Sequence, residues 1–302
     1  MSTLWPRLRP PRLAIIFPSP ARTRRNLKLR SCHTTTTTST ISMTAPTPDD
    51  IQPTITTTTT TIPNATLISR MQAYVTTQMR NHDPSHNPAH VTRVVRLAHR
   101  LLAAERARGT SIPYNDTIIT LAALLHDIGD RKYLARDSSS SGAQEDPRTV
   151  VRDTLIHSGS DPILAQKVQT IVSNVSYSTE IKNPAFVQRL ISENGYPELA
   201  IVQDADRLDA IGAVGIGRCF TYLGAKGPRP GADGPLRWEL DEAVEHFGEK
   251  LVKLESMMKT DSGRDMARER TLRLQEFMRW WRQEMEEMDG VVEYSGVAIP
   301  PS

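Results

Sequence analysis

The apolar residues of this chain recur with helical spacing over most of its length. Between residues 90 and 102 they fall three and four positions apart, and arginines occupy the opposite side. This spacing lays one apolar stripe along a helix of 3.6 residues per turn, and it predicts an amphipathic helix. The apolar positions of this stripe are Val91, Val94, Val95, Ala98, Leu101 and Leu102.

Helix start signals and the same apolar spacing predict further helices. Residues 117–127 form one, with Asp116 as its cap. The other predicted helices begin at Pro162 behind the cap Asp161, at Pro184 and at Pro197, extend over 240–258, and close the domain around 274–281.

No segment alternates apolar and polar residues as a half-buried strand does, so the chain is predicted to be all-α with a single globular domain. Two interruptions are predicted to be surface loops. The first, 137–147, contains four consecutive serines, and the second, 224–235, contains four glycines and three prolines.

Residues 1–63 are predicted to be disordered, because their threonine tracts and Arg- and Pro-rich beginning offer little to bury. The first 30 residues lack acidic side chains and are rich in arginine, as mitochondrial transit peptides are. Alternatively, this stretch is a dispensable extension and Met43 is the working start. The folded domain is expected over 64–290, with a C-terminal tail over 291–302.

The charge distribution argues against a nucleic-acid partner. The net charge is +3, but residues 1–48 carry eight basic side chains and no acidic one, which leaves 29 basic against 34 acidic side chains. No run of 18 apolar residues predicts a membrane span. The two cysteines, Cys32 and Cys219, predict no disulfide. Because no disulfide is expected, a reducing compartment is favoured, which is the cytoplasm, or the mitochondrion if the N-terminus is a transit peptide.

The dipeptide His126-Asp127 is the strongest sign of chemistry in the sequence. It ends an apolar run over 118–125, which would carry a histidine and a carboxylate toward the interior. Burial of such groups is unfavourable unless they are paired or bind a metal, and imidazole nitrogen with carboxylate oxygen suits a divalent cation. Two other segments could complete such a site: His90, at the start of the amphipathic helix, and the acidic stretch over 203–210.

These segments, in this order, resemble the HD-domain metal-dependent phosphohydrolase superfamily, whose pattern is a histidine, an adjacent His-Asp pair and a distant aspartate. The closer resemblance is to bacterial and fungal HD proteins of the nucleotide pyrophosphohydrolase type. It is carried by 85–90 (SHNPAH), 126–133 (HDIGDRKY), 202–213 (VQDADRLDAIGA) and 245–251 (EHFGEKL). The resemblance runs from about residue 68 to 287 and implies an HD-domain helical bundle.

The resemblance implies four metal ligands, which are His90, His126, Asp127 and Asp206. Two imidazoles and two carboxylates leave coordination positions for water and a phosphate oxygen. Mn²⁺ is favoured, with Mg²⁺, Co²⁺, Ni²⁺, Fe²⁺ and Zn²⁺ as alternatives. Asp204 and Asp209 stay open as alternatives to Asp206, because a helical wheel places both nearer the apolar side. Asp206 is preferred because the superfamily places its ligand in the Ala-Asp-Arg-Leu context.

Three further residues are candidates for catalysis. Asp130, just after the His-Asp pair, is expected to transfer a proton or orient water, with a solvated carboxylate at a helix end as the alternative. By the same resemblance, Lys132 and Arg207 are expected to neutralise charge on the substrate phosphates. Arg93 and Arg218 are further candidates for phosphate contacts, but they are better explained as surface or structural ion-pair residues.

The implied function is pyrophosphohydrolysis of (deoxy)nucleoside triphosphates by a metal-activated water, with a nucleotide as the small-molecule substrate. Alternatives are an HD phosphomonoesterase or 5′-nucleotidase, and a non-catalytic regulatory protein that binds nucleotides. The helices over 245–285 could close the site or form a homodimer contact. His86 is best explained as structural, although its closeness to His90 would let it touch the site or the substrate.

Overall fold

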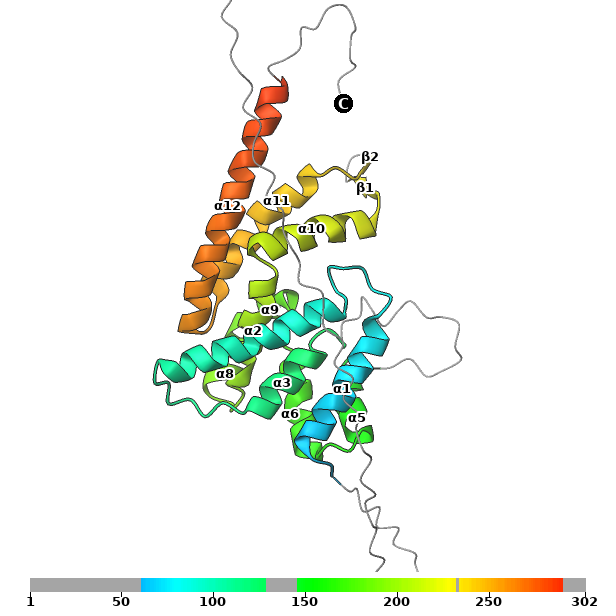
Figure 1. Ribbon diagram of the computed structural model, residues 1–302, viewed down its shortest axis with the longest axis vertical. Helices are drawn as coiled ribbons and strands as arrows, with labels where there is room; N and C mark the ends of the chain where they lie inside the picture. The colour runs from blue at the N-terminus through cyan, green and yellow to red at the C-terminus, as the bar shows by residue number, and fades with distance from the viewer. Residues whose placement is uncertain (1–60, 129–145, 232–233, 290–302) are drawn as a thin grey trace, which may run out of the picture. The chain divides into compact units, whose positions relative to one another are not determined.

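Helices make up most of the structure, a computed structural model that describes residues 61–128, 146–231 and 234–289 (Figure 1). The predicted N-terminal transit or Thr-rich segment up to residue 60, the predicted loop up to residue 145 and the tail over 291–302 lie outside the described residues. Within the described part, no helix combines the length and the apolar character that crossing a membrane requires.

The described residues form helices and one pair of short strands. They are α1 (Asn64–Met79), α2 (Pro88–Ala107), α3 (Asp116–Leu125), α5 (Val150–His157), α6 (Pro162–Val172), α7 (Tyr177–Lys182), α8 (Pro184–Ser192), α9 (Glu198–Asp209), α10 (Gly212–Lys226), β1 (Arg229–Gly231), β2 (Gly234–Arg237), α11 (Asp241–Glu249), the 3₁₀ helix η1 (Leu251–Met257) and α12 (Asp261–Asp289).

The all-α class is confirmed, with one addition. The region predicted as a loop over 224–235 begins as the last turn of α10 and continues into an antiparallel hairpin, in which Arg229 of β1 pairs with Arg237 of β2. This hairpin is the one sheet in the described residues. Gly227, with a φ of 67°, ends α10 in a backbone conformation that glycine adopts without strain.

The start signals were right for α6 and one residue out for α3. The Asp161 carboxylate accepts hydrogen bonds from the backbone N–H groups of Ile163 and Leu164, as predicted. At α3 the cap is Asn115, whose side-chain oxygen accepts from the N–H of Ile118 at 3.1 Å. Asp116, which had been expected to cap this helix, is its first helical residue. Both residue types favour caps, so the sequence alone could not separate two adjacent candidates.

The prediction of one long helix over 240–258 was wrong. The chain forms α11, breaks at Lys250, where φ is −129°, and continues as the 3₁₀ helix η1. Phe247, Leu251 and Leu254 are buried across this break. Apolar residues three and four apart suit a helix of three residues per turn as well as an α-helix, so the spacing did not reveal the change.

The folded part begins slightly earlier than predicted. Ile62, which falls within the segment expected to be disordered, donates its N–H to the carbonyl of Gly159 at 3.1 Å and packs against the buried residues of the first core group. Its side chain is the nearest neighbour of the Gly159 Cα face, where a Cβ would lie about 3.2 Å from it. The chain is therefore held in place two residues before α1 begins.

Two apolar core groups meet at α9. One joins α1, α3, α5, α6 and α8, and the other joins α2, α3, α11, η1 and α12. Leu199 and Val202 of α9 belong to the first group, whereas Ile201 and Leu208 belong to the second. Every residue of α9 is buried except Asp206. This helix is therefore fixed on nearly all sides, and loss of a core side chain such as Leu208 should cost about 2–5 kcal/mol of stability.

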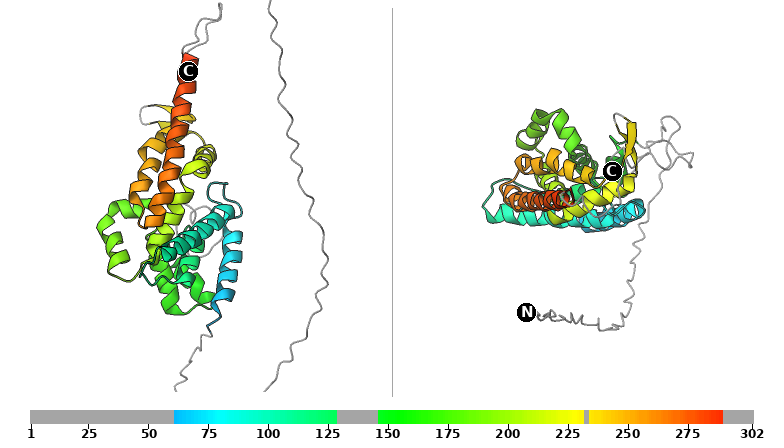
Figure 2. Two further views of the ribbon diagram at one scale, coloured as in Figure 1. Left: turned by 60° about the vertical axis from the view of Figure 1, so that its left-hand side comes forward. Right: turned by 90° about the horizontal axis from the view of Figure 1, so that it is seen from above.

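α10 and α12 continue from this centre. Gly212, with a φ of 73°, lets the chain turn sharply from the end of α9 into α10. α12 then runs alongside α10 and α11, as Figure 2 shows, and its N-terminal end returns to α9. These two connections bring side chains of α10 to the face of α9 that carries Asp206.

Candidate metal centre

His90 enters the structure in the first turn of α2. Pro88 occupies the first helical position, and the side chain of Asn87 accepts hydrogen bonds from the N–H groups of Ala89 and His90. This capped start fixes the direction in which the imidazole leaves the helix. The His90 side chain is only 1% exposed.

His126 and Asp127 lie at the point where α3 ends. α3 stops at Leu125, and His126 is its C-terminal cap. The Nδ1–H of His126 donates to the carbonyl of Ala123 at 2.8 Å, which turns Nε2 toward His90. The helix end allows two consecutive residues to flank one point, as the sequence required.

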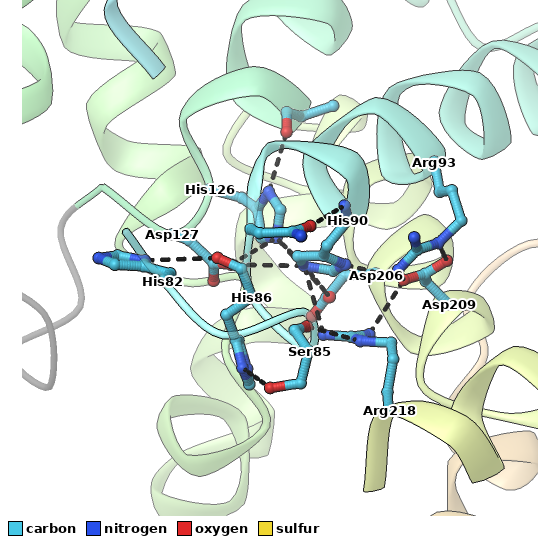
Figure 3. Close-up of polar contacts among 12 residues, drawn as sticks. His82, Ser85, His86, His90, Arg93, His126, Asp127, Asp206, Asp209 and Arg218 are labelled. Carbon is cyan, nitrogen blue, oxygen red and sulfur yellow. Dashed lines mark hydrogen bonds and ion pairs between the residues drawn. The ribbon is translucent and has the colours of Figure 1, made fainter. Parts of the chain in front are cut away.

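Three residues from α2 and the end of α3 converge on a single point, with α9 beside them (Figure 3). The Nε2 atoms of His90 and His126 are 3.1 Å apart, and Asp127 Oδ2 lies 3.4 Å from each of them. Asp206 Oδ1 lies 3.7 Å from both imidazole Nε2 atoms. We call these four residues the ligand cluster. Ligand atoms of His90, His126 and Asp127 all lie within 4.8 Å of one another.

Asp209 holds His90 in position from the other side of the ring. Its Oδ2 accepts the Nδ1–H of His90 at 2.8 Å. Arg93 donates to both oxygens of this carboxylate, and Arg218 Nη1 forms an ion pair with it at 3.1 Å. Burial alone would raise the pKa of Asp209, but the hydrogen bonds from His90 and Arg93 and the charge of Arg218 hold that pKa well below its usual range.

The chemistry of the cluster requires a positive charge at its centre. His126 and His90 each donate through Nδ1, so each neutral ring carries a lone pair on Nε2, and these two lone pairs face one another at 3.1 Å. Asp127 Oδ2 is buried beside them without a hydrogen-bond partner. An unpartnered buried carboxylate oxygen and two opposed lone pairs are unfavourable unless a proton or a cation lies between them.

A divalent ion fits this donor set. Two nitrogens that each lie about 2.1 Å from one ion, at a right angle, are about 3 Å apart, which agrees with the spacing of the two imidazoles. Burial lowers the pKa of His90, but the neighbouring carboxylates of Asp127 and Asp209 outweigh it and raise that pKa. The pKa of Asp127 is correspondingly lowered, since the two histidines outweigh the effect of its burial. The cluster therefore attracts a cation to its centre.

Of the three aspartates that competed for the fourth place, the structure brings Asp206 to the cluster. Asp209 contacts the Nδ1 side of His90, away from the converging Nε2 atoms. Asp204 lies on the opposite face of α9, where its carboxylate accepts hydrogen bonds from Lys259 N, Thr260 N and Thr260 Oγ1. Asp204 is buried, in agreement with the helical wheel, which placed it on the apolar side of the helix.

The expected phosphate contact of Arg207 is not supported by its position. The guanidinium is buried on the far face of α9, where it pairs with Glu180 and donates to the carbonyl of Met257 at 2.8 Å. A residue that directly follows Asp206 on a helix points about 100° away from it, so a single helix cannot present both side chains to one small site. Arg207 stabilises the packing of α9 instead.

The two remaining catalytic candidates, Asp130 and Lys132, lie outside the described residues. Their assignments to proton transfer and to phosphate binding remain sequence-based predictions.

Arg218, for which the sequence favours a structural role over a phosphate contact, lies beside the cluster. Its Nε donates to the carbonyl of Ser85 at 2.8 Å, and its Nη2 lies 3.5 Å from His90 Nε2. The ion pair with Asp209 agrees with the structural role that was favoured for it. The sequence did contain one relevant pattern: Arg218, Tyr222 and Lys226 are four residues apart, which puts all three on one face of α10.

His86 contributes a further ring beside the cluster. Its Nδ1 is 2.7 Å from Ser85 Oγ, and Ser85 Oγ also contacts the carboxylate of Asp83. The His86 ring meets the His90 ring edge-on, with 5.9 Å between centroids. Burial lowers the pKa of His86 to about 4, so its ring is neutral at physiological pH.

A cavity of about 850 Å³ lies elsewhere, between the C-terminal end of α2, the start of α9 and the start of α12. Tyr114, Glu105 and Glu198 are among the residues that line it, and no member of the ligand cluster is. Its volume is in the range of ligand sites, but the converging metal donors lie outside it. The cluster, rather than this cavity, is the candidate site.

Comparison with known proteins agrees with the fold. The family model described as the HD domain matches residues 89–211, which include His90, His126, Asp127 and Asp206. The uncharacterized protein YpgQ of Bacillus subtilis is 33% identical over 210 residues, covering 70% of this chain and 89% of that protein. An uncharacterized protein of Acanthamoeba polyphaga mimivirus, L803, is 32% identical over 110 residues, covering 34% of this chain and 41% of that protein.

Solved structures extend the similarity to most of the folded part. YpgQ of Bacillus subtilis in complex with ADP has a TM-score of 0.50 and 27% identity, and the match covers 73% of this chain and 96% of that one. An HD-superfamily hydrolase of Bacillus thuringiensis has a TM-score of 0.50 and 28% identity, with coverage of 74% and 99%. The chain belongs to the HD-domain family.

Proposed function

We propose that this protein is a divalent-metal-dependent phosphohydrolase that hydrolyses (deoxy)nucleoside triphosphates to the monophosphate and pyrophosphate. The observation that carries the proposal is the ligand cluster itself: two imidazole lone pairs and an unpartnered buried carboxylate oxygen directed at one point. The ADP bound to the Bacillus subtilis relative supports a nucleotide as the substrate class. Family membership supports hydrolysis as the reaction.

His90, His126, Asp127 and Asp206 would hold the ion, with Mn²⁺ favoured. When bound, such an ion polarises a phosphoryl oxygen and makes water a stronger nucleophile at neutral pH. Asp130 is proposed to orient that water or to move its proton, and Lys132 to neutralise phosphate charge, as the sequence predicts.

The protein's own groups prepare the site for this chemistry. Asp209 and the Ala123 carbonyl accept the Nδ1–H of His90 and of His126, so in the neutral form of each ring the lone pair is on Nε2, toward the cluster. Burial of both rings keeps water away from their contacts and strengthens local electrostatics. The preorganised donors therefore need little rearrangement when an ion and a phosphate bind.

The test is a hydrolysis assay of the full chain with nucleoside triphosphates and added Mn²⁺, in which pyrophosphate and orthophosphate are measured separately. The proposal predicts pyrophosphate and nucleoside monophosphate as products. Orthophosphate release would favour the phosphomonoesterase alternative. Tight nucleotide binding without hydrolysis in any of several divalent metals would favour the non-catalytic alternative.

His126→Ala is the companion variant. It should lose bound metal and hydrolysis together, because it removes one of the two nitrogens that face the centre. His157→Ala is the matched control, since His157 is exposed at the end of α5, a helix that contributes no residue to the ligand cluster. Metal content is measured by elemental analysis of purified protein. Retention of wild-type metal content in His126→Ala would contradict the proposed centre.

A further inference from the structure

A line of ring contacts leads from the ligand cluster toward the C-terminal end of α10. The His90 and His126 ring centroids are 5.1 Å apart, and the His86 ring is 5.9 Å from that of His90. Tyr222 follows, with its ring centroid 5.6 Å from that of His86. At the end of the line, Lys226 Nζ lies 5.0 Å from the centroid of the Tyr222 ring.

The last two members of this line, Tyr222 and Lys226, lie on one face of α10. Arg218, Tyr222 and Lys226 are four residues apart, which places them above one another on a helix. Arg218 lies at the cluster, where its Nη2 approaches His90 Nε2. Lys226 lies two turns, roughly 12 Å, further along the helix. We call these three residues the α10 stripe.

Arg218 is fixed at the end of the stripe nearest the cluster. Its side chain is 12% exposed, and contacts with Ser85 and Asp209 hold it in place. Its Nη1 pairs with the Asp209 carboxylate by charge but makes no hydrogen bond. A buried guanidinium beside a cation site, with donor capacity left over, is best satisfied by an anion such as a phosphate oxygen.

Lys226 supplies the second positive charge. It is exposed, and its ammonium contacts the face of the Tyr222 ring. The ring keeps the ammonium on the side of α10 that leads back to the cluster. Such a cation–π contact typically increases the population of this side-chain position about twofold to fivefold. The stripe therefore has a cation at each end and an aromatic ring between them.

We propose that the α10 stripe binds the polyphosphate chain of the substrate, with Arg218 at the phosphate next to the ligand cluster and Lys226 at the phosphate farthest from it. This inference rests on the proposed function, because it concerns the substrate of the same site. Because the two cations lie two helical turns apart, a single phosphate held at the cluster would not reach both, whereas a chain of linked phosphates would extend from Arg218 toward Lys226. The stripe thus selects for two or more linked phosphates.

The test uses probes without a nucleoside, so that it does not depend on which nucleotide is hydrolysed. The full chain is titrated calorimetrically with tripolyphosphate and with orthophosphate in excess Mg²⁺, and the metal content of each variant is measured. Mg²⁺ binds the phosphate probes in solution to the same extent in every titration, so this effect cancels when the binding constants of two variants are compared. Lys226→Ala should weaken tripolyphosphate binding about tenfold and leave orthophosphate binding within about twofold.

Three further variants sharpen the result. Lys226→Arg should retain tripolyphosphate binding, because it keeps the charge. Tyr222→Phe should also retain it, since the ring remains. Lys253→Ala removes an exposed lysine of η1 and serves as the control, with no change expected.

The inference is overturned if Lys226→Ala weakens both probes equally, weakens neither, or if the wild-type chain does not bind tripolyphosphate. It is also overturned if Tyr222→Leu weakens binding of a nucleoside monophosphate and leaves tripolyphosphate unaffected, because the stripe would then hold the base. The proposed function fails separately, if the wild-type chain binds tripolyphosphate with these variant effects yet releases no pyrophosphate from any nucleotide.

Discussion

The two faces of α9 carry acidic residues that are close in sequence and have opposite roles. On one face, Asp206 is 30% exposed and contributes an oxygen to the ligand cluster, while Asp209 orients His90. On the other face, Asp204 and Arg207 are buried in contacts with the start of α12 and with Glu180. One face carries the proposed metal ligand, and the other fixes the helix within the fold.

The face opposite the cluster is a network of buried charges. Glu180 receives Arg207 and Lys259 as ion-pair partners and a hydrogen bond from Gln203 at 3.1 Å. Asp204 anchors the backbone where α12 begins, and a side chain at Gly263 would collide with its carboxylate. We call this set the anchoring network. On this side of α9, paired buried charges therefore take the place of an apolar surface.

The largest expected effect comes from the anchoring network. Arg207→Met should lower the free energy of unfolding by about 3–5 kcal/mol, because it removes one partner of a buried carboxylate and leaves that charge poorly compensated. Urea unfolding followed by circular dichroism measures the change. Arg96→Met, at an exposed position of α2, is the control and should stay within about 0.5 kcal/mol of wild type. Similar small changes in both variants would contradict a stabilising role for Arg207.

Substitution on the cluster face should have the opposite profile. Asp206→Ala should weaken metal binding by about 100-fold, the upper end of what even outer-shell partners contribute, and change the free energy of unfolding by less than about 0.5 kcal/mol. The reason is that Asp206 is the one residue of α9 that is not buried. Metal titration and urea unfolding of the same preparation give both quantities. If Asp206→Ala lost stability but retained metal, Asp206 would be a structural residue and not a metal ligand.

The smallest of these effects depends on pH. Burial would raise the pKa of Glu180, but Lys259 and Arg207 together hold it below its ordinary value. Such a carboxyl stabilises the fold above its unfolded pKa of about 4.3, and this contribution is lost as the pH falls through its lower, folded-state pKa. Glu180→Gln should therefore be less stable than wild type by about 1–3 kcal/mol at pH 7. The gap should shrink below about pH 4. A gap that stays constant down to pH 3 would rule out this titration as its source.

Local signals in the sequence predicted most of the helices and marked the His-Asp pair as a candidate for buried chemistry. Apolar spacing identifies a buried helix face wherever it lies in the fold, and the His-Asp pair at the end of an apolar run marks buried chemistry. His90, which is distant in sequence, was connected to that pair through the family resemblance. Its first-turn position on α2 then agreed with the geometry of the structure.

What the sequence could not predict is which neighbour each charged side chain would meet. Arg207 was expected at the phosphates because it follows Asp206, yet its direction on α9 takes it to Glu180, a residue of α7 that no local pattern connects with it. Arg218 was expected to be structural, and its contact with His90 depends on the turn at Gly212. Such pairings are set by the packing of helices far apart in the chain, and they decide between an anchoring and a ligand-binding role.

The proposed metal centre is tested by soaking a crystal of the full chain in Mn²⁺ and locating the ion by anomalous scattering. One strong peak is expected between His90, His126, Asp127 and Asp206, within about 2.0–2.3 Å of a nitrogen or oxygen of each. No peak at this point, or a peak held by Asp204 on the opposite face of α9, would contradict it.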